Sequence, residues 1–444
     1  MRGQTIFAPS TVYGKSGVAV IRISGDDALK AVEKLSNLDV EEMKPRYAYF
    51  TVLHDVKTKE ITDHALVLYF KAPHSFTGED IVEIQCHGSK AVLKSVLESL
   101  GDIEGFRLAE PGEFSKRAFY HNKMDLTEAE GLADLIDADT KEQQKQALRQ
   151  MSGNLRKLYD SWREKLVKIY AYLEAYIDFP EEDIDEAVVV ESEHTVDELI
   201  REIKQHLSSS QNGERLREGF HVALIGPANA GKSSLMNAFA EREVVIVSDI
   251  AGTTRDAVDI YLDLSGYPVI VTDTAGLREC VDEIEKRGIE ITRQKAKDAD
   301  LIIGLFDAST DGKDVLSDFN SAKTICVANK SDKLSEAQKK KFEEEGCLLV
   351  SVKTKEGLCA LSDMIVARIR ESMASYSSEV ITRVRYREAL KECLENLEAF
   401  DVHKEIELAC EDIRLAARAL GKITGQVEAG EILDKIFGAF CIGK

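Results

Sequence analysis

The chain has 444 residues, which is too long for one hydrophobic core of the usual size, so we expect two or three domains. Its content of 44% hydrophobic and 31% charged residues is typical of a soluble globular protein. The formal net charge of −21 argues against general, non-specific electrostatic binding of nucleic acid, which needs clusters of lysine and arginine.

The sequence predicts neither a membrane span nor a secretion signal. No apolar stretch reaches about 18 residues, and the first ten residues, MRGQTIFAPS, lack the apolar core of a signal peptide. The eight cysteines include no C-x-x-C pair, so neither a zinc site nor a disulfide framework is indicated. We therefore expect a cytoplasmic protein.

Residues 1–119 are predicted to form a separate domain of mixed strands and helices. The predicted strands are Gly17–Ser24, Arg46–Leu53 and Thr62–Phe70, and the predicted helices are Asp26–Leu35 and Lys90–Leu100. The segment Gly14–Gly17 matches the G-x-x-G of KH RNA-binding loops, but it precedes a strand, whereas the KH loop joins two helices. We interpret it as a turn.

Residues 120–215 change to a helical period, with apolar residues recurring at three- and four-residue spacing from Leu126 to Ile136. One long helix is predicted at Gln143–Tyr176 and another at Val196–Leu207. The acidic segment Pro180–Asp185 between them is interpreted as a solvated loop, with metal binding as the alternative.

The segment Gly226–Ser234, GPANAGKSS, fits the phosphate-binding pattern G-x-x-x-x-G-K-[ST] between a predicted strand, His221–Ile225, and a predicted helix, Ser234–Phe239. Backbone N–H groups in such a loop surround a phosphate at a helix N-terminus. Lys232 is then expected to reach the β- and γ-phosphates, and Ser233 to ligate Mg²⁺. The other expected phosphate-loop contacts are Asn229, Ala230, Gly231 and Ser234.

Three further motifs each follow a predicted strand, namely Tyr267–Thr272, Thr324–Ala328 and Leu348–Val350. The first motif offers a carboxylate near Mg²⁺ and a glycine N–H for the γ-phosphate, and an aspartate in the second can accept two hydrogen bonds that guanine offers and adenine does not. The third stands where GTPases carry Ser-Ala-Lys beside the guanine oxygen. The motif residues are Asp273, Thr274, Ala275 and Gly276; Asn329, Lys330 and Asp332; and Ser351, Val352 and Lys353.

Two details narrow the type of GTPase predicted at residues 216–375. Leu277 stands where Ras-like enzymes place the glutamine that orients the attacking water, so the water must be held in another way. Asn229, with the long segment Ser248–Asp256, resembles GTPases that bind K⁺ and act when two G domains pair. The alternative is a GTPase of slow intrinsic rate with an outside activator.

Residues 376–444 are predicted to be helical again, at Val380–His403 and Glu405–Leu420. Because these helices have no core of their own, we expect them to pack on the helices before the GTPase, which makes the GTPase an insertion. Cys441 stands fourth from the end, but Gly443 and Lys444 fit a prenylation box poorly. A tail after a helix ending at Phe440 is the plainer interpretation.

Beyond these motifs, several segments resemble the MnmE (TrmE) family of bacterial tRNA-uridine modification GTPases over essentially the whole chain. These segments are Gly17–Gly25, Pro73–Asp80 with Glu83, Pro111–Ser115 with Arg117–Phe119, Lys123–Leu126, Asp178–Pro180 and Cys441–Lys444. The fold class is then multidomain α/β plus α: an N-terminal α+β domain, an all-α helical domain, and an inserted Ras-like, doubly wound P-loop G domain.

The resemblance implies that the N-terminal domain is like the folate-binding part of aminomethyltransferases and binds a tetrahydrofolate carrying a one-carbon unit. Arg22, Glu83, Lys123 and Lys444 match the family's folate contacts. From the residues alone, Glu83 would be a solvated strand-end carboxylate, whereas a cation such as Arg22 within an apolar strand is rarely left unpaired. In the family, Cys441 is required for modification.

The resemblance also implies the roles in GTP hydrolysis. Glu285 would orient water through a second, bridging water; Ser233 and Thr254 would hold Mg²⁺; and K⁺ would be held by Asn229, Ser248, Ile250 and Thr253. Two positions depart from the family pattern. The loop reads Gly-Pro-Ala-Asn where the family has Gly-Lys/Arg-Pro-Asn, which bears on loop stiffness, and Ser248 replaces the commoner threonine.

The family further implies a homodimer formed through the N-terminal domain, and a heterotetramer with an MnmG-type flavoprotein that carries FAD. Together they would install a carboxymethylaminomethyl or aminomethyl group on the wobble uridine of certain tRNAs. A ribosome-assembly or RNA-binding, K⁺-dependent GTPase is the alternative, and it needs a KH-type or basic module that the sequence lacks. A folate-dependent aminomethyl carrier with a regulatory GTPase is a third hypothesis.

Overall fold

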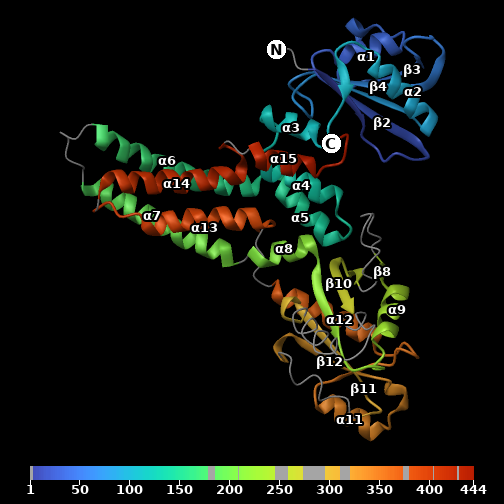
Figure 1. Ribbon diagram of the computed structural model, residues 1–444, viewed down its shortest axis with the longest axis vertical. Helices are drawn as coiled ribbons and strands as arrows, with labels where there is room; N and C mark the ends of the chain where they lie inside the picture. The colour runs from blue at the N-terminus through green and yellow to red at the C-terminus, as the bar shows by residue number, and fades with distance from the viewer. Residues whose placement is uncertain are drawn as a thin grey trace, which may run out of the picture. The chain divides into compact units, whose positions relative to one another are not determined.

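The computed structural model describes residues 4–178, 186–208, 210–245, 259–273, 296–310, 321–373, 380–403, 405–427 and 430–444. These residues belong to two compact units (Figure 1). One unit combines Met1–Ala133 with Gly421–Lys444, and the other is Asp134–Leu420. Among the helices that these ranges contain, none has the length and apolar content that a membrane span needs.

The first unit is built on a six-stranded sheet in the order β3-β4-β5-β2-β1-β6. Neighbouring strands are antiparallel except β1 and β6, which are parallel. The strands are β1 Thr5–Pro9, β2 Ser16–Ser24, β3 Ala48–His54, β4 Ile61–Phe70, β5 Ile81–Gly88 and β6 Phe106–Leu108. Because β2 begins at Ser16, within the Gly14–Gly17 segment, this segment is not a KH loop between helices.

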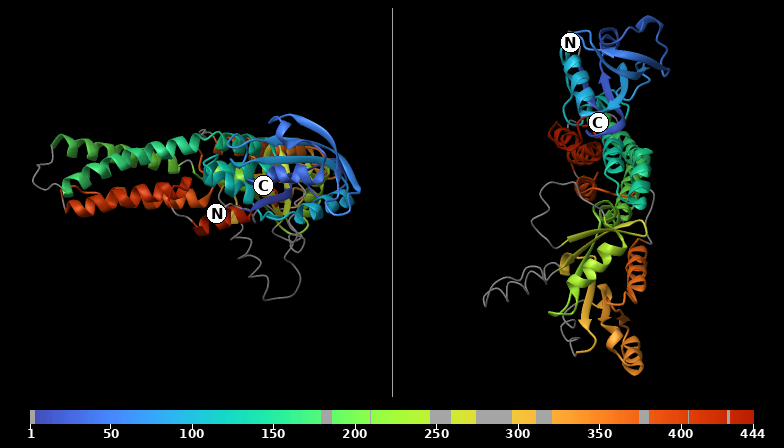
Figure 2. Two further views of the ribbon diagram at one scale, coloured as in Figure 1. Left: turned by 90° about the horizontal axis from the view of Figure 1, so that it is seen from above. Right: turned by 90° about the vertical axis from the view of Figure 1, so that its right-hand side faces the viewer.

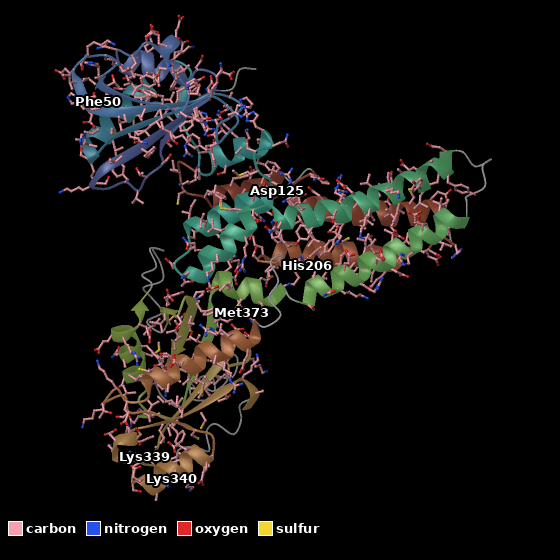
Figure 3. All side chains as sticks on the ribbon, turned by 180° about the vertical axis from the view of Figure 1, so that it is seen from behind. Phe50, Asp125, His206, Lys339, Lys340 and Met373 are labelled. Atoms are coloured by element: carbon pink, nitrogen blue, oxygen red, sulfur yellow. The ribbon has the colours of Figure 1, made fainter. Side chains whose placement is uncertain are left out.

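One face of this sheet carries the core of the unit, and the other face is partly exposed. Helices α1 (Ala28–Leu35) and α2 (Lys90–Gly101) supply the core together with inward-facing strand residues such as Val67. Since side chains alternate along a strand, the neighbours of Val67 face outward. On the outer face, Phe50 of β3, labelled in Figure 3, pairs with Leu66 of β4. The two residues are 70% and 38% exposed.

The end of the chain packs against helices from its N-terminal part. Helix α15 (Gly430–Gly438) lies against α3 (Glu113–Tyr120), where Lys116 Nζ is 2.8 Å from Asp434 Oδ1. A small apolar cluster joins α15 and Phe440 to the start of α4 (Leu126–Ile136). The residues after α14 therefore belong to the same compact unit as the N-terminal sheet.

The second unit begins with helices that pack with those after the GTPase segment, as predicted. In Figures 1 and 2, four long helices lie side by side: α6 Asn154–Asp178, α7 Glu186–Ser208, α13 Val384–Ala399 and α14 Ile406–Thr424. Gln150, which precedes the inserted domain in the sequence, accepts a 3.0 Å hydrogen bond at Oε1 from Oγ1 of Thr382, which follows that domain.

Two of the predicted helices differ most from the structure. The prediction of one helix over Gln143–Tyr176 is wrong, because α5 (Lys141–Met151) ends before Gly153, which has a φ of 73° that a helix does not allow. Helix α7 starts at Glu186 rather than Val196, so it includes three consecutive valines of low helix propensity. Burial of Ser192 and Val196 shows that tertiary packing decides this segment.

The inserted domain has a seven-stranded sheet in the order β13-β12-β11-β7-β10-β9-β8. All described pairs are parallel except those of β9 with β8 and β10. Its strands are β7 Phe220–Ile225, β8 Val244–Val245, β9 Asp259–Leu264, β10 Tyr267–Asp273, β11 Leu301–Asp307, β12 Thr324–Asn329 and β13 Leu348–Leu349.

Both faces of this sheet are covered. Val222 and Leu224 pack with helices α9 (Lys232–Arg242) and α12 (Leu358–Ser372), while Ala223 and Ile225 pack with residues 296 and 299 on the opposite face. Helix α11 (Glu336–Glu344) covers the β12–β13 end, where Phe342 joins the apolar cluster. Helix α8 (Ser210–Glu218) leads into β7.

Candidate functional site

The predicted nucleotide motifs gather at one edge of the second sheet. Strands β7, β10, β11 and β12 are parallel, and their register pairs Leu224 with Asp273 and Asp307 with Asn329. Since the carboxyl ends of parallel strands meet at the same edge, the loop after β7 lies beside Asp273 and Asn329. This is the edge at which ligands bind in open α/β sheets.

The geometry of the phosphate loop requires the residues found there. Gly231 caps α9 with a φ of 100°, and a Cβ at this position would clash with Asn329 Nδ2. Asn229 has a φ of 63°, which asparagine tolerates better than most residues. Asn329 Nδ2 donates a 2.7 Å hydrogen bond to the Ala230 carbonyl, so the guanine motif also supports the phosphate loop.

Three predicted phosphate and Mg²⁺ residues lie together where α9 starts and β10 ends. The buried Lys232 donates from Nζ to the carbonyls of Gly226 (2.7 Å) and Pro227 (2.9 Å), which holds its ammonium group over the loop. Ser233 Oγ lies 3.5 Å from Asp273 Oδ2. Hydroxyl and carboxylate oxygens are the hard ligands that Mg²⁺ prefers, so this pair fits the predicted metal role.

The predicted guanine residues form one hydrogen-bonded group. Ser351 Oγ donates to Asp332 Oδ1 at 2.7 Å, and this bond is the main cause that lowers the pKa of Asp332 below its usual range. A carboxylate that stays ionised is the acceptor that guanine recognition needs. The N–H of Val352 donates to Asn329 Oδ1 at 3.2 Å, which joins the two loops.

Asp307, at the end of β11, belongs to this group and was not predicted. Lys330 Nζ donates to Asp307 Oδ2 at 2.6 Å and to the Asn229 carbonyl at 3.1 Å. Burial raises the pKa of Asp307, but hydrogen bonds from Lys330 and Ser309 outweigh burial and lower it. Its position at a strand end, like that of Asp273, is the signal that could have revealed it.

A second candidate site lies on the outer face of the N-terminal sheet. Arg22 of β2 and Glu83 of β5 are register partners, with Arg22 Nη2 2.9 Å from Glu83 Oε1 and both side chains 17% exposed. Glu83 is therefore an ion-paired residue within a strand rather than a solvated carboxylate at a strand end. The Arg22 guanidinium also lies over the ring of Phe76, 5.1 Å from its centroid, and sequence reasoning missed this contact.

The C-terminal motif reaches the strand next to Arg22. Gly443 has a φ of 97°, a Cβ there would clash with the Pro9 carbonyl, and the Gly443 carbonyl accepts a 3.2 Å hydrogen bond from Ser10 Oγ. Pro9 follows Ala8, which is the register partner of Arg22 on β1. Lys444 and the exposed Cys441 are thus held at the end of the strand that neighbours Arg22.

Lys123 lies close to the segment that contains Phe76. A Cβ at Gly78 would stand 3.4 Å from Lys123 Cε, and His121 Nδ1 is 2.7 Å from the Thr77 carbonyl. The structure therefore pairs Arg22 with Glu83 directly and brings Lys123 and Lys444 to segments next to them.

Several predicted residues lie outside the described ranges. They are Ser248, Ile250, Thr253 and Thr254 of the long switch segment, Thr274, Ala275, Gly276 and Leu277 after β10, and Glu285. Of the predicted K⁺ ligands, Asn229 is the one within the described residues, and of the Mg²⁺ ligands it is Ser233.

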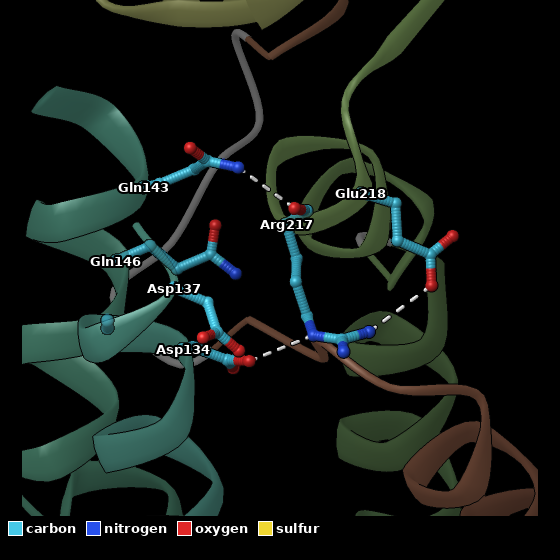
Figure 4. Close-up of a pocket in the computed structure, with 7 residues that line it drawn as sticks. Asp134, Asp137, Gln143, Gln146, Arg217 and Glu218 are labelled. Carbon is cyan, nitrogen blue, oxygen red and sulfur yellow. Dashed lines mark hydrogen bonds and ion pairs between the residues drawn. The ribbon is translucent and has the colours of Figure 1, made fainter. Parts of the chain in front are cut away.

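A cavity of about 150 Å³ lies between α5 and α8, away from the predicted sites (Figure 4). Arg217 crosses it, donating from Nε to Asp134 Oδ1 at 2.9 Å, while Gln143 Nε2 donates to the Arg217 carbonyl at 3.0 Å. Arg383 also contacts Asp134 Oδ1, at 2.7 Å. These hydrogen bonds and ion pairs connect α5 and Asp134 to the end of α8, directly before β7. We therefore interpret this region as a structural connection between the helices and the GTPase domain rather than as a reaction site.

Comparison with known families identifies the chain. A family model described as the MnmE helical domain matches residues 126–441, more than half of the chain, and the model of the GTP-binding protein TrmE N-terminus matches residues 5–123. The chain belongs to the MnmE family. The resemblance drawn from the sequence motifs is confirmed.

Individual MnmE relatives match over their whole length. The tRNA modification GTPase MnmE of Rickettsia akari (strain Hartford) is 46% identical over 447 residues, covering 99% of this chain and 100% of the relative. That of Wolbachia sp. subsp. Brugia malayi (strain TRS) is 45% identical, covering 99% of each chain. The solved FeoB G-domain from Methanococcus jannaschii is 21% identical and covers 34% of this chain and 98% of that chain, but its TM-score of 0.25 supports no conclusion.

Proposed function

We propose that this member of the MnmE family hydrolyses GTP and couples hydrolysis to modification of the five-position of the wobble uridine in certain tRNAs. The observation that carries the proposal is the hydrogen-bonded group at the sheet edge, in which Asn329 contacts both the phosphate loop and the Val352 loop. Family membership supplies the link to tRNA.

In this proposal the inserted domain binds GTP with Mg²⁺ and K⁺. Asp332 would accept hydrogen bonds from guanine, and Lys232 would contact the phosphates. Ser233 and Thr254 would hold Mg²⁺, with the Asp273 carboxylate close to the metal. The proposed K⁺ ligands are Asn229 with oxygens of Ser248, Ile250 and Thr253, and Glu285 orients water. The fit of Ser233 and Asp273 oxygens to a hard cation supports the metal role.

The test is GTP turnover by the full chain in KCl and in NaCl at equal ionic strength. We expect faster turnover in KCl, and loss of this stimulation in Glu285→Ala. Equal rates in the two salts would reject the K⁺ role. If Glu285→Ala keeps K⁺-stimulated turnover, the assignment of that residue is wrong.

In the N-terminal domain we propose a site for a tetrahydrofolate that carries a one-carbon unit. The folate's glutamate tail offers carboxylates that Arg22, Lys123 and Lys444 can hold, and its pterin offers paired N–H donors that suit Glu83. The pairing of Arg22 with Glu83, beside the aromatic ring of Phe76, supports this proposal because it offers a cation, a carboxylate and a flat apolar surface together.

Titration calorimetry with 5-formyltetrahydrofolate tests the folate proposal directly. Micromolar binding that Arg22→Ala weakens is the expected result, and a folded protein without any binding would reject the site. Cys441 is proposed to be required for modification, and mass spectrometry of tRNA nucleosides after reaction with Cys441→Ser tests this requirement.

We further propose that the chain forms a homodimer through its N-terminal domain and joins an FAD-bearing, MnmG-type flavoprotein. The exposed pair Phe50 and Leu66 on the outer face of the sheet supports a contact there, because apolar pairs of this kind favour burial. Phe50→Asp with Leu66→Asp should yield a monomer by light scattering. The matched control Leu408→Asp, at an exposed leucine of α14, should leave the dimer intact.

A further inference from the structure

Two cysteine thiols face each other across the strands that lead to the guanine loops. Cys326 lies in β12, and Cys347 directly precedes β13. Because Val327 pairs with Leu348, the cysteines stand opposite each other one residue earlier. Their Sγ atoms are 2.7 Å apart.

The backbone at this position suits a disulfide. Neighbouring strands lie about 4.7–4.9 Å apart, which is within the roughly 4.4–6.8 Å between Cα atoms that a disulfide spans. Both cysteines belong to the apolar cluster under α11, with Phe306 and Phe342. Closing the bond therefore needs a small movement of the sulfur atoms and no rearrangement of the sheet.

Access to the two thiols differs in the way that a stepwise oxidation requires. Cys326 is partly exposed, whereas Cys347 is 5% exposed and its N–H donates to the Phe342 carbonyl at 2.9 Å. An oxidant can therefore reach Cys326 first. The buried Cys347 is already in contact with the sulfur that it would attack.

We propose that Cys326 and Cys347 are an oxidative modification site, at which a peroxide converts the thiol pair to a reversible disulfide that clamps the guanine loops. The Cys326 thiolate attacks a peroxide oxygen and breaks the O–O bond, giving a sulfenic acid and, with a proton, one water. The Cys347 thiol then forms the S–S bond and releases the second water. The two thiols lose two protons and two electrons in total, and hydrogen peroxide is reduced to two waters.

The clamp follows from where the two strands lead. β12 ends at Asn329, and the chain after β13 passes through Val350 to Ser351. The two loops already share the bonds from Ser351 to Asp332 and from Val352 to Asn329, at 2.7 Å and 3.2 Å. A covalent link between β12 and the residue before β13 keeps these partners in place, and a preordered site loses less freedom when it holds a ligand. Guanine nucleotide should therefore leave the oxidised protein more slowly.

The experiment treats the reduced full-length protein with hydrogen peroxide and then alkylates and digests it for peptide mapping. We expect one peptide pair joined through Cys326 and Cys347, two hydrogens lighter than the separate peptides and separated again by dithiothreitol. Release of a fluorescent GDP analogue should be roughly threefold slower or more from the oxidised protein. Cys326→Ser and Cys347→Ser should each abolish both effects, and Cys359→Ser, an exposed cysteine of the same domain, should abolish neither.

Each outcome bears on one part of the proposal. Oxidation of Cys359 without the Cys326–Cys347 link would overturn the modification site, and this result on the unmutated protein does not depend on how the variants fold. Formation of the link with unchanged release would overturn the clamp. The clamp rests on the proposed guanine site, so failure of the reduced protein to hold the GDP analogue would instead reject the proposed function, while the peptide map still decides the link.

Discussion

The two sheets of this chain use their faces in opposite ways. The sheet of the inserted domain is covered on both faces, so its predicted functional residues stand at strand ends, as Asp273 and Asn329 do. The N-terminal sheet has α1 and α2 on one face, while on the other face α3 covers β1 through Phe114. Its candidate residues Arg22 and Glu83 lie in mid-strand on that second face. A site at an edge is built from consecutive loop residues, whereas a site on a face is built from residues that alternate and come from distant parts of the chain.

The largest expected effect concerns the edge site. Lys232→Ala removes the ammonium group held over the phosphate loop, and losing such a charge from a phosphoryl-transfer site should lower kcat for GTP by on the order of 10²–10³. Phosphate release in KCl is the measurement. The matched control is Lys340→Ala, an exposed lysine on α11 (Figure 3), which should leave the rate unchanged. A comparable loss in the control would contradict the assignment.

The next largest effect is expected at Asp332, the proposed guanine acceptor at the same edge of the sheet. Asp332→Asn exchanges an ionised acceptor for an amide, and the lost charge-assisted bonds should weaken GDP binding roughly 100-fold. Because an amide can also donate, binding of xanthosine diphosphate should improve. Competition titrations measure both changes, with Asp363→Asn on α12 as the exposed control. If GDP affinity holds in Asp332→Asn, guanine is recognised elsewhere.

A smaller effect is expected on ligand binding at the Arg22–Glu83 site, on the outer face of the N-terminal sheet. Arg22→Ala leaves Glu83 without its cation, and folate affinity should fall by roughly 10- to 100-fold. Arg22→Lys keeps the charge but not the planar fork, so an intermediate loss is expected. Calorimetry measures the affinities, and Lys94→Ala, an exposed lysine on α2, is the control. Equal affinity in all variants would show that this face does not hold the folate.

The smallest expected effect concerns how the stability contributed by the Asp307–Lys330 ion pair depends on pH. In the folded chain the pKa of Asp307 lies below its ordinary value of 3.8, so its pairing with Lys330 stabilises the fold above that pH and is lost as the pH falls through the folded pKa. Asp307→Asn should therefore lower stability by about 1 kcal/mol or less at pH 6. The difference should shrink below pH 4, and urea unfolding of the nucleotide-free protein across this range measures it. A difference that grows in acid would have the wrong sign.

The comparison also explains what could be predicted from the sequence. The phosphate loop and the strand-end motifs were found because each is a local pattern after an apolar run, and the structure brings their described residues together. Asp307 was missed because its strand-end position is its one signal in the sequence, and no motif surrounds it to draw attention to that position. The pairing of Arg22 with Glu83 and the return of Gly443 to Pro9 depend on register and on contacts across the whole chain, which periodicity does not reveal.

Helix boundaries show the same limit. The apolar period continues from α5 into α6, but Gly153, with a φ of 73°, ends the first helix. A glycine at this position is a common helix stop, and the prediction gave it less weight than the period. The valines of α7 disfavour a helix locally, and packing overrides this preference. The segments that carry the predicted K⁺ ligands after Asn229 lie outside the described residues, so those assignments stay predictions.

Two strands of the inserted domain link the phosphate edge to the helices at the opposite end of the sheet. β7 begins next to α8 and ends at the phosphate loop, and β10 begins at Tyr267, beside Gly266, whose carbonyl accepts a 3.1 Å hydrogen bond from the N–H of Glu142, and ends at Asp273. A strand resists stretching along its length, so a displacement at one end of β7 or β10 would be transmitted to the other end. A displacement of Asp273 along β10 would therefore move Gly266 in the same direction, and with it the first turn of α5 that is hydrogen-bonded to Gly266.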